Sequence, residues 1–315
     1  MEPRELIVVA IGGNSLIRDE AHRSIPDQWE LTRETCGHVA ALVAAGYRVV
    51  LTHGNGPQVG FILRRSELAR HELHPVPLDS CDADTQGAIG YMVQQSLHNE
   101  FRRRGLARQA VALVTQVEVD AASPAFAHPS KPIGAFMDET TARRRQAEGW
   151  AVAEDAGRGW RRLVPSPEPL AIVELPVIRT LVEAGYVVVA AGGGGIPVAR
   201  DAAGELRGVE AVIDKDLASS LLARGLGADA LVISTSVERV CLNFGRPDQV
   251  ELERLTLAEA RRHLRAGQFG AGSMAPKIEA LARFLEAGGR RAVVTSPQSL
   301  ERALAGEAGT EILAG

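Results

Sequence analysis

The chain has 315 residues, of which 45% are hydrophobic and 23% charged, the composition of a globular protein and not of a disordered or fibrous one. Its net charge of −4 and its lack of a basic stripe with interleaved aromatic residues argue against nucleic acid as a partner. The longest apolar runs, such as Val187–Ala191, have the length of a strand, so we predict no membrane span and no membrane partner.

Apolar runs typical of buried strands alternate with helix patterns along most of the chain. The predicted strands are Leu6–Ile11, Tyr47–Leu51, Ala110–Val114, Val187–Ala190, Ala230–Ile233 and Arg291–Thr295. The predicted helices are a long one that ends near Ala45, with Gly46 as its cap, and then Thr85–Arg104, Ile172–Ala184, Leu217–Arg224, Leu257–Ala266 and Lys277–Ala287. This alternation predicts an α/β fold in which βαβ units form a mainly parallel central sheet.

Two further features bear on where the protein works. The first predicted strand begins at Leu6, so we expect no signal peptide before it. The three cysteines, Cys36, Cys81 and Cys241, are odd in number and far apart, and they form no disulfide framework. We therefore predict a cytoplasmic protein in a reducing compartment.

One segment, Ala121 to Pro169, interrupts the alternation of strands and helices. It is rich in proline, and it contains Trp150, Trp160 and the turn Gly157-Arg158-Gly159. Such a composition is typical of an irregular insertion with short hairpins that projects from the main sheet. We predict a first lobe over residues 1–225, with this subdomain inserted at about 121–170, and a second lobe over residues 226–315.

Three of the predicted strands run directly into glycine clusters. The clusters are Gly12-Gly13-Asn14, Gly54-Asn55-Gly56-Pro57 and Gly192-Gly193-Gly194-Gly195. In a parallel sheet the carboxyl ends of the strands share one edge, where ligands bind, and glycine lets backbone N–H groups approach a ligand closely. The clusters favour a site for a polyanion, and the alternative is that the glycines serve only the packing of turns.

Lysine is rare in this chain, which has only Lys131, Lys215 and Lys277 among its 35 lysines and arginines. None of the three lies on a pattern typical of a solvated helix. Because lysine is a compact point charge that can reach a single oxygen in a crowded pocket, we interpret them as the charged groups of one anion site. The alternative is a compositional drift towards arginine that left three random lysines.

The triplet Asp214-Lys215-Asp216 follows an apolar stretch and opens a predicted helix. Its two carboxylates are suited to orienting the Lys215 ammonium group and to binding Mg²⁺ through oxygen. The structural alternative is an aspartate that caps the helix and forms a local ion pair.

The common nucleotide-binding motifs do not match. No lysine follows a glycine, so the Walker pattern G-x-x-x-x-G-K-[ST] is absent. Residues Gly270–Ala275 match the dinucleotide fingerprint by letter, but they follow the end of a predicted helix and not a strand. With Pro276 and Lys277 at the start of the next helix, the same loop is still a good phosphate cradle.

Several long motifs together resemble the carbamate kinases, a branch of the amino acid kinase family. The motifs are Gly12-Gly13-Asn14, His53–Gly60, Lys131–Gly134, Gly192–Pro197, Gly208–Asp216 and Gly272–Lys277, with similar strings at Asp79–Gln95, Glu154–Arg162 and Val164–Pro167. The resemblance extends from about residue 6 to Gly309-Thr310. Ala135-Phe136-Met137 and Ser236 depart from the family pattern, but neither departure replaces a charged group.

The resemblance implies an open αβα sandwich in two lobes with a protruding subdomain, a homodimer, and ATP or ADP with Mg²⁺ as cofactors. It implies that a phosphoryl group passes reversibly between ATP and carbamate, giving ADP and carbamoyl phosphate. We expect a role in the fermentative breakdown of arginine, and the sequence leaves open whether the reaction in the cell makes ATP or carbamoyl phosphate. Carbamate is already an anion at neutral pH, so its oxygen needs no general base, and we interpret His53 as structural.

The resemblance also implies roles for individual residues. The implied catalytic residues are Asn14, Lys131, Asp214, Lys215, Asp216 and Lys277. The residues implied to bind carbamate and the transferring phosphoryl group are Gly12, Gly13, Gly54, Asn55, Gly193 and Gly194. The residues implied to bind the nucleotide are Ser234, Val240, Gly270, Ser273, Met274 and Lys277, and Asp216 is the implied ligand of Mg²⁺.

Two other functions stay open from the sequence. One is a different enzyme of the same fold that makes an acyl phosphate from an amino acid. The absence of an arginine near the loop His53–Gly60, which would bind a second carboxylate, favours a very small substrate instead. The other is a non-catalytic protein that binds a nucleotide, which the presence of all three lysines and both aspartates argues against.

Overall fold

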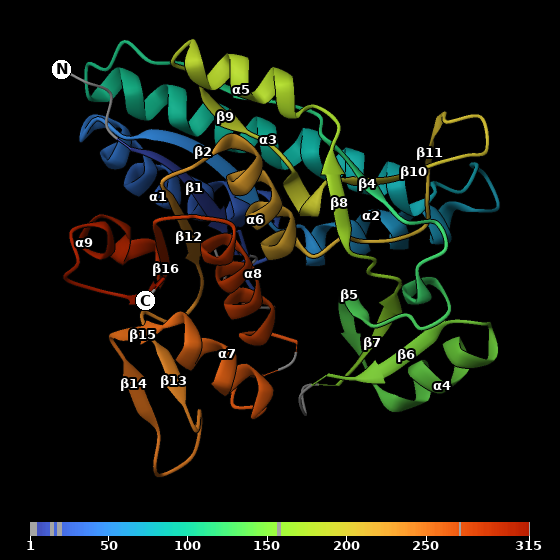
Figure 1. Ribbon diagram of the computed structural model, residues 1–315. Helices are drawn as coiled ribbons and strands as arrows, with labels where there is room; N and C mark the ends of the chain where they lie inside the picture. Colours follow the sequence, from blue (N-terminus) through green and yellow to red (C-terminus); the bar gives the residue numbers. More distant parts are fainter. Residues whose placement is uncertain (1–4, 13–15, 18–20, 156–158, 271, 315) are drawn as a thin grey trace.

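The computed structural model describes residues 5–12, 16–17, 21–155, 159–270 and 272–314, and its centre is an eight-stranded sheet (Figure 1). In spatial order the strands are β15 (Arg254–Thr256), β17 (Thr310–Leu313), β16 (Arg291–Thr295), β12 (Ala230–Ser234), β1 (Leu6–Ile11), β2 (Arg48–His53), β9 (Val187–Val189) and β3 (Ala110–Ala112). All neighbouring pairs are parallel except β16 and β17. The predicted α/β class with a mainly parallel sheet is therefore confirmed.

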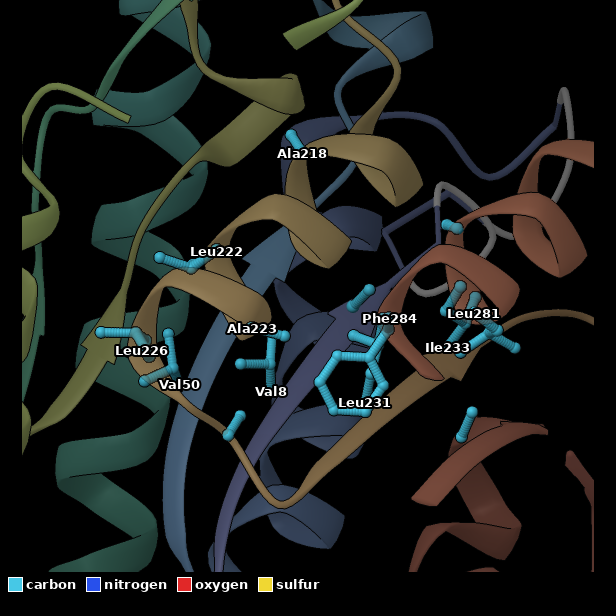
Figure 2. Close-up of a cluster of buried hydrophobic side chains, with 14 of the residues drawn as sticks. Val8, Val50, Ala218, Leu222, Ala223, Leu226, Leu231, Ile233, Leu281 and Phe284 are labelled. Atoms are coloured by element: carbon cyan, nitrogen blue, oxygen red, sulfur yellow. The ribbon is translucent and has the colours of Figure 1, made fainter. Parts of the chain in front are cut away.

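Helices cover both faces of this sheet. One face packs on α1 (Ile25–Ala44), α3 (Leu78–Arg103) and α9 (Leu300–Leu304), and the other on α5 (Leu175–Glu183), α6 (Lys215–Leu226) and α8 (Ala275–Glu286). The central strand β1 is buried on both sides, because Leu6, Val8 and Ala10 enter one core and Ile7, Val9 and Ile11 the other. Figure 2 shows the first of these cores, where Val8 and Val50 lie near Leu222 of α6 and Phe284 of α8. The result is the expected αβα sandwich.

The other elements extend this sandwich on both sides. A four-stranded sheet has the order β11 (Leu206–Gly208), β10 (Ile196–Arg200), β4 (Gln116–Val119) and β8 (Pro169–Ile172). Helix α2 (Gly56–Ala69) follows β2 directly, and α7 (Leu257–Arg265) precedes α8. The strands β13 (Val240–Leu242) and β14 (Val250–Leu252) form a hairpin. Among the described residues, none of the helices has an apolar stretch long enough to cross a bilayer.

The insertion forms a small unit of its own. Strands β5 (Lys131–Met137), β7 (Trp160–Val164) and β6 (Ala151–Glu154) form an antiparallel sheet in that order, with α4 (Glu139–Ala147) beside it. Figure 1 shows this unit set apart from the main sheet. It contacts α2 through an ion pair of 2.7 Å between Arg162 and Glu67 and through a close backbone approach of Gly60 and Gly134.

Some predicted boundaries were wrong. Helix α3 begins at Leu78 and not at Thr85, and α5 begins at Leu175 and not at Ile172. Ile172 instead pairs with Val117 in the four-stranded sheet, and Pro176 lies in the first turn of α5, where its missing N–H group costs nothing. The predicted strands Leu6–Ile11 and Arg291–Thr295 and the cap at Gly46, with its φ of 95°, are confirmed.

Candidate functional site

The three lysines meet at two aspartates. Lys131 Nζ, from β5, lies 2.7 Å from Asp214 Oδ2, and Lys277 Nζ, from α8, lies 2.9 Å from Asp216 Oδ2. Lys215 Nζ lies 2.5 Å from Asp216 Oδ1. Partners that are 83 and 61 residues apart in the chain thus form one continuous cluster at the start of α6.

The local fold of α6 builds the centre of this lysine–aspartate cluster. Asp214 is the N-cap of α6, and its Oδ1 accepts hydrogen bonds from the backbone N–H groups of Asp216 and Leu217, at 2.9 and 3.2 Å. The structural reading of the Asp-Lys-Asp triplet is confirmed, because Asp214 caps the helix with one oxygen while its other oxygen pairs with Lys131, and the role in binding Mg²⁺ stays a prediction. The cap fixes the direction in which Lys215 leaves the helix.

The charges of the cluster are mutually stabilised. Burial opposes the ionisation of Asp216, but Lys215 and Lys277 outweigh it and hold the pKa of Asp216 far below its usual value. Burial likewise opposes the ionisation of Asp214, and Lys131 reverses that effect and lowers the pKa of Asp214. Burial lowers the pKa of Lys215, and the charge of Asp216 opposes this shift without cancelling it. Three ammonium groups against two carboxylates leave one net positive charge for an anion.

A cleft of about 920 Å³ opens beside the cluster. Of the residues predicted for the site, those that line it are Gly54, Asn55, Lys131, Gly193, Asp214, Lys215, Asp216, Ser273 and Lys277. Those that do not line it are Gly12, Gly194, Ser234, Val240, Gly270 and Met274, whereas Gly13 and Asn14 lie outside the described residues. The cleft therefore unites the predicted lysines, aspartates and two of the three glycine clusters.

The glycine cluster after β9 has a packing reason as well as a place in the cleft. Gly193 has a φ of 72°, and a Cβ there would lie 2.3 Å from the Asn55 side chain. A Cβ on Gly194 would lie 2.5 Å from the carbonyl oxygen of Ile213, just before the aspartates. Close packing thus gives Gly193 and Gly194 a structural reason, and the role of this cluster in binding a polyanion stays a prediction.

His53 is the last residue of β2 and lies against Gly192 of the third glycine cluster. Its Nδ1 is 3.1 Å from the Gly54 carbonyl oxygen, and its ring fills the space that a side chain at Gly192 would need. Burial, together with the charge of Lys215, lowers the pKa of His53 to about 4. A buried neutral imidazole in this position fits the structural role that we expected for it.

Four of the residues predicted to bind nucleotide, Gly270, Ser273, Met274 and Lys277, lie at the start of α8. The carbonyl oxygen of Gly270 accepts the backbone N–H groups of Ser273, Met274 and Ala275, at 3.0 to 3.1 Å, and so shapes the turn into α8 and Lys277. Ser234 ends β12, and its buried Oγ has no hydrogen-bond partner among the described residues. That oxygen is suited to a ligand that enters at this edge of the sheet.

The residues present fit Mg²⁺ only in combination with phosphate. Both oxygens of Asp216 already bond lysines, and no group of three or more His, Cys, Asp or Glu residues in the described part of the chain is placed to hold a metal. Mg²⁺ usually takes one or two carboxylates and completes its shell with water and substrate phosphates. The role predicted for Asp216 as a metal ligand stays a prediction.

Some residues of the site were not predicted from the sequence. Arg23, Phe61, Phe136 and Arg161 line the cleft, and of these only Phe136 and Arg161 lie in strings that the resemblance included. Asp82 on α3 is fully buried and accepts a hydrogen bond of 2.7 Å from Asn55. It lies within the family-like string Asp79–Gln95, which was the one available signal.

Comparison with known proteins agrees with this geometry. Residues 5–296 match the amino acid kinase family. The chain is 52% identical to the carbamate kinase-like protein YahI of Escherichia coli, covering 98% of this chain and 99% of the relative. It is 47% identical to the carbamate kinase of Thermococcus kodakarensis, covering 98% of both chains.

Solved structures give the same result. The carbamate kinase of Giardia lamblia bound to citric acid superposes with a TM-score of 0.94 at 40% identity, covering 99% of both chains. The same enzyme bound to AMP-PNP superposes with a TM-score of 0.91 at 41% identity, again over 99% of both chains.

Proposed function

The chain belongs to the amino acid kinase family, and we propose that it is a carbamate kinase, which transfers a phosphoryl group reversibly between ATP and carbamate. The observation that carries the proposal is the cluster of Lys131, Lys215 and Lys277 on two aspartates beside the cleft. The carbamate kinases among its relatives match it over almost the full length of both chains.

In the proposed reaction an oxygen of carbamate attacks the γ-phosphorus of ATP, and the bond from that phosphorus to the oxygen of ADP breaks. Because carbamate is an anion, no base is needed, and catalysis consists of alignment and of neutralising the charge that develops. The ammonium groups of Lys215 and Lys277 hold the phosphates, and Lys131 approaches from the inserted unit. This assignment agrees with a neutral His53, which takes no proton from the substrate.

The acceptor binds at the start of α2. Helix α2 begins at Gly56 without a side-chain cap, so its free N–H groups and its partial positive charge are available to a carboxylate. Gly54, Asn55 and Gly193 complete this end of the cleft. We assign Gly12, Gly13, Asn14 and Gly194 to the transferring phosphoryl group on the resemblance alone, since Gly12 and Gly194 do not line the cleft.

The nucleotide binds towards α8, with Ser234, Val240, Gly270, Ser273, Met274 and Lys277 around it. Mg²⁺ bound together with the nucleotide would add positive charge at its phosphates, and Asp216 is the carboxylate that would hold it. In this proposal the first lobe, residues 1–225 with the inserted unit at about 121–170, binds the acceptor, and the second lobe, residues 226–315, binds the nucleotide.

We also propose a cytoplasmic homodimer that acts in the breakdown of arginine. The three cysteines are free and buried, as suits a reducing compartment. Light scattering on the purified protein tests the dimer, because a mass near 33.5 kDa would identify a monomer instead.

The decisive experiment measures ATP formed from carbamoyl phosphate, ADP and Mg²⁺. We expect steady turnover, which the Lys215→Ala variant abolishes. ADP release with carbamate, glutamate, acetylglutamate, aspartate or UMP identifies the acceptor, since an enzyme for an amino acid would respond to that acid and not to carbamate. Nucleotide binding without turnover on any acceptor would favour the non-catalytic alternative.

A further inference from the structure

Asn55 occupies the N-cap position of α2, but its side chain does not cap that helix. Its Nδ2 instead donates to two acceptors on α3, Asp82 Oδ1 at 2.7 Å and Thr85 Oγ1 at 2.9 Å. All three side chains are buried, with at most 2% of Asn55 exposed. The amide of Asn55 is therefore held from behind by the neighbouring helix.

The hydrogen bonds fix which end of the amide points to α3. The Thr85 hydroxyl donates its proton to the backbone carbonyl oxygen of Asp82, at 2.7 Å, so it can only accept from Asn55. Burial raises the pKa of Asp82, while Asn55 opposes that shift. Asp82 Oδ1 accepts a hydrogen bond both when Asp82 is ionised and when its proton is on Oδ2. The NH₂ group of Asn55 therefore faces α3.

With both N–H bonds used, the carbonyl oxygen of Asn55 is the polar atom left over. Within the described ranges, Asn55 Oδ1 has no hydrogen-bond donor, although Asn55 lines the cleft beside Gly54 and Gly56. A Cβ on Gly193 would lie 2.3 Å from Nδ2, so a glycine is required beside the amide, and the two hydrogen bonds to α3 hold its orientation. The site thus presents a fixed acceptor at the end where the substrate binds.

We propose that Asp82 and Thr85 are positioning residues that hold the Asn55 amide so that its Oδ1 accepts a hydrogen bond from the amino group of the substrate. The inference rests on the proposed function, because carbamate and carbamoyl phosphate both have this NH₂ group. Backbone N–H groups at the start of α2 can bind only the oxygens, which acetate and acetyl phosphate share. Asn55 Oδ1 is therefore the group that distinguishes the amino group from a methyl group of similar size.

The test compares ATP formation from carbamoyl phosphate and from acetyl phosphate on the same protein. We expect the wild-type enzyme to prefer carbamoyl phosphate in kcat/KM by at least about ten-fold, since a methyl group leaves a buried acceptor without a partner. Thr85→Val keeps the shape of the side chain but removes one acceptor for Nδ2, so it lowers this preference several-fold. Thr85→Ser keeps the hydroxyl group and the preference.

Two further variants complete the comparison. Asp82→Ala removes the other acceptor and lowers the preference as Thr85→Val does. Ser96→Ala is the matched control, because Ser96 is buried on the same helix and its Oγ has no partner among the described residues. It leaves the preference unchanged.

The outcomes separate the two proposals. A wild-type enzyme that makes no ATP from carbamoyl phosphate contradicts the proposed function itself. A wild-type enzyme that is active but uses both phosphates equally overturns the role of Asn55, and this measurement needs no variant to fold. If Thr85→Val and Asp82→Ala reduce both activities by the same factor, Asp82 and Thr85 serve only to join α2 to α3.

Discussion

The scarcity of lysine was the most useful signal at the scale of single residues. We interpreted each lysine as a compact point charge at one anion site, and the structure brings all three to Asp214 and Asp216. The pairing itself could not be predicted, because it depends on which of α8 and β5 packs against each end of the Asp-Lys-Asp triplet.

Removing any one of the three lysines should reduce turnover strongly. We expect Lys131→Ala, Lys215→Ala and Lys277→Ala each to lower kcat by about 10²–10⁴-fold, because each removes a charge that stabilises the transferring phosphoryl group. Steady-state rates of ATP formation measure this, with Arg102→Ala on the exposed side of α3 as a control for loss of one positive charge. Near-normal kcat in any two lysine variants would contradict the assignment.

His53 should make the stability of the protein depend on pH. Its pKa is about 4 in the folded protein and near 6.5 when unfolded, so acid protonates the unfolded chain first. The stabilising effect is complete above pH 6.5 and is lost as the pH falls towards 4. Between pH 7 and pH 5 this amounts to about 2 kcal/mol of unfolding free energy.

Urea unfolding of the wild type and of His53→Gln at both pH values measures that difference. On acidification from pH 7 to pH 5, the unfolding free energy of the variant should fall by about 2 kcal/mol less than that of the wild type. The raised pKa of Asp82 acts in the opposite direction, but it is common to both proteins and cancels in the comparison. Equal losses would mean that His53 is accessible to protons in the folded state.

At the scale of elements, segments with a clear apolar pattern were predictable, and segments that begin at a glycine cluster were not. The strand β1 and the helices α1, α6 and α8 have apolar faces that the sequence displays directly. Helix α2 was missed because it starts inside a glycine cluster that looks like a turn. Strand β10 follows the third glycine cluster immediately, and therefore no α-helix begins there whose N-terminus could bind a ligand. The segment of β10 is a strand only because it pairs with β4 and β11.

The contact between α2 and β5 should control where Lys131 lies. A Cβ on Gly60 would lie 2.1 Å from Gly134 Cα, and this neighbour is backbone that cannot rotate away. Gly60→Ala therefore pushes β5 from α2 and shifts Lys131, three residues before Gly134. We expect kcat to fall by about ten- to a hundred-fold, as misplacement by about 1 Å commonly does.

Gly87→Ala on α3 is the matched control for that change, since no atom lies within 4 Å of its added Cβ. It should keep the wild-type kcat, and it should not lower the thermal stability, because alanine is the better helix former. A Gly60→Ala variant with normal kcat would show that the inserted unit tolerates displacement.

At the scale of the whole molecule, the cluster joins three parts of the chain that the sequence analysis treated separately. Lys131 comes from the insertion, Asp214 and Asp216 from the end of the first predicted lobe, and Lys277 from the second. A second connection runs from Arg283 on α8 to Glu168, at the exit of the insertion, at 2.5 Å. The sequence led to the prediction that the three lysines bind one anion. The ion pairs that link the predicted lobes could be found only from the fold.

Because the proposed site draws residues from all of these parts, we expect the nucleotide to stabilise the entire chain. AMP-PNP with Mg²⁺ at 100 times its Kd adds about 2.7 kcal/mol, which for a chain of 315 residues raises Tm by about 4 °C. Thermal unfolding in Mg²⁺ and in EDTA measures the part that the metal contributes. We expect a clearly smaller shift at the same total nucleotide concentration in EDTA, because the phosphates then meet the lysines without Mg²⁺, and almost none in Lys277→Ala. An identical shift with and without Mg²⁺ would contradict the proposal that the metal enters with the nucleotide.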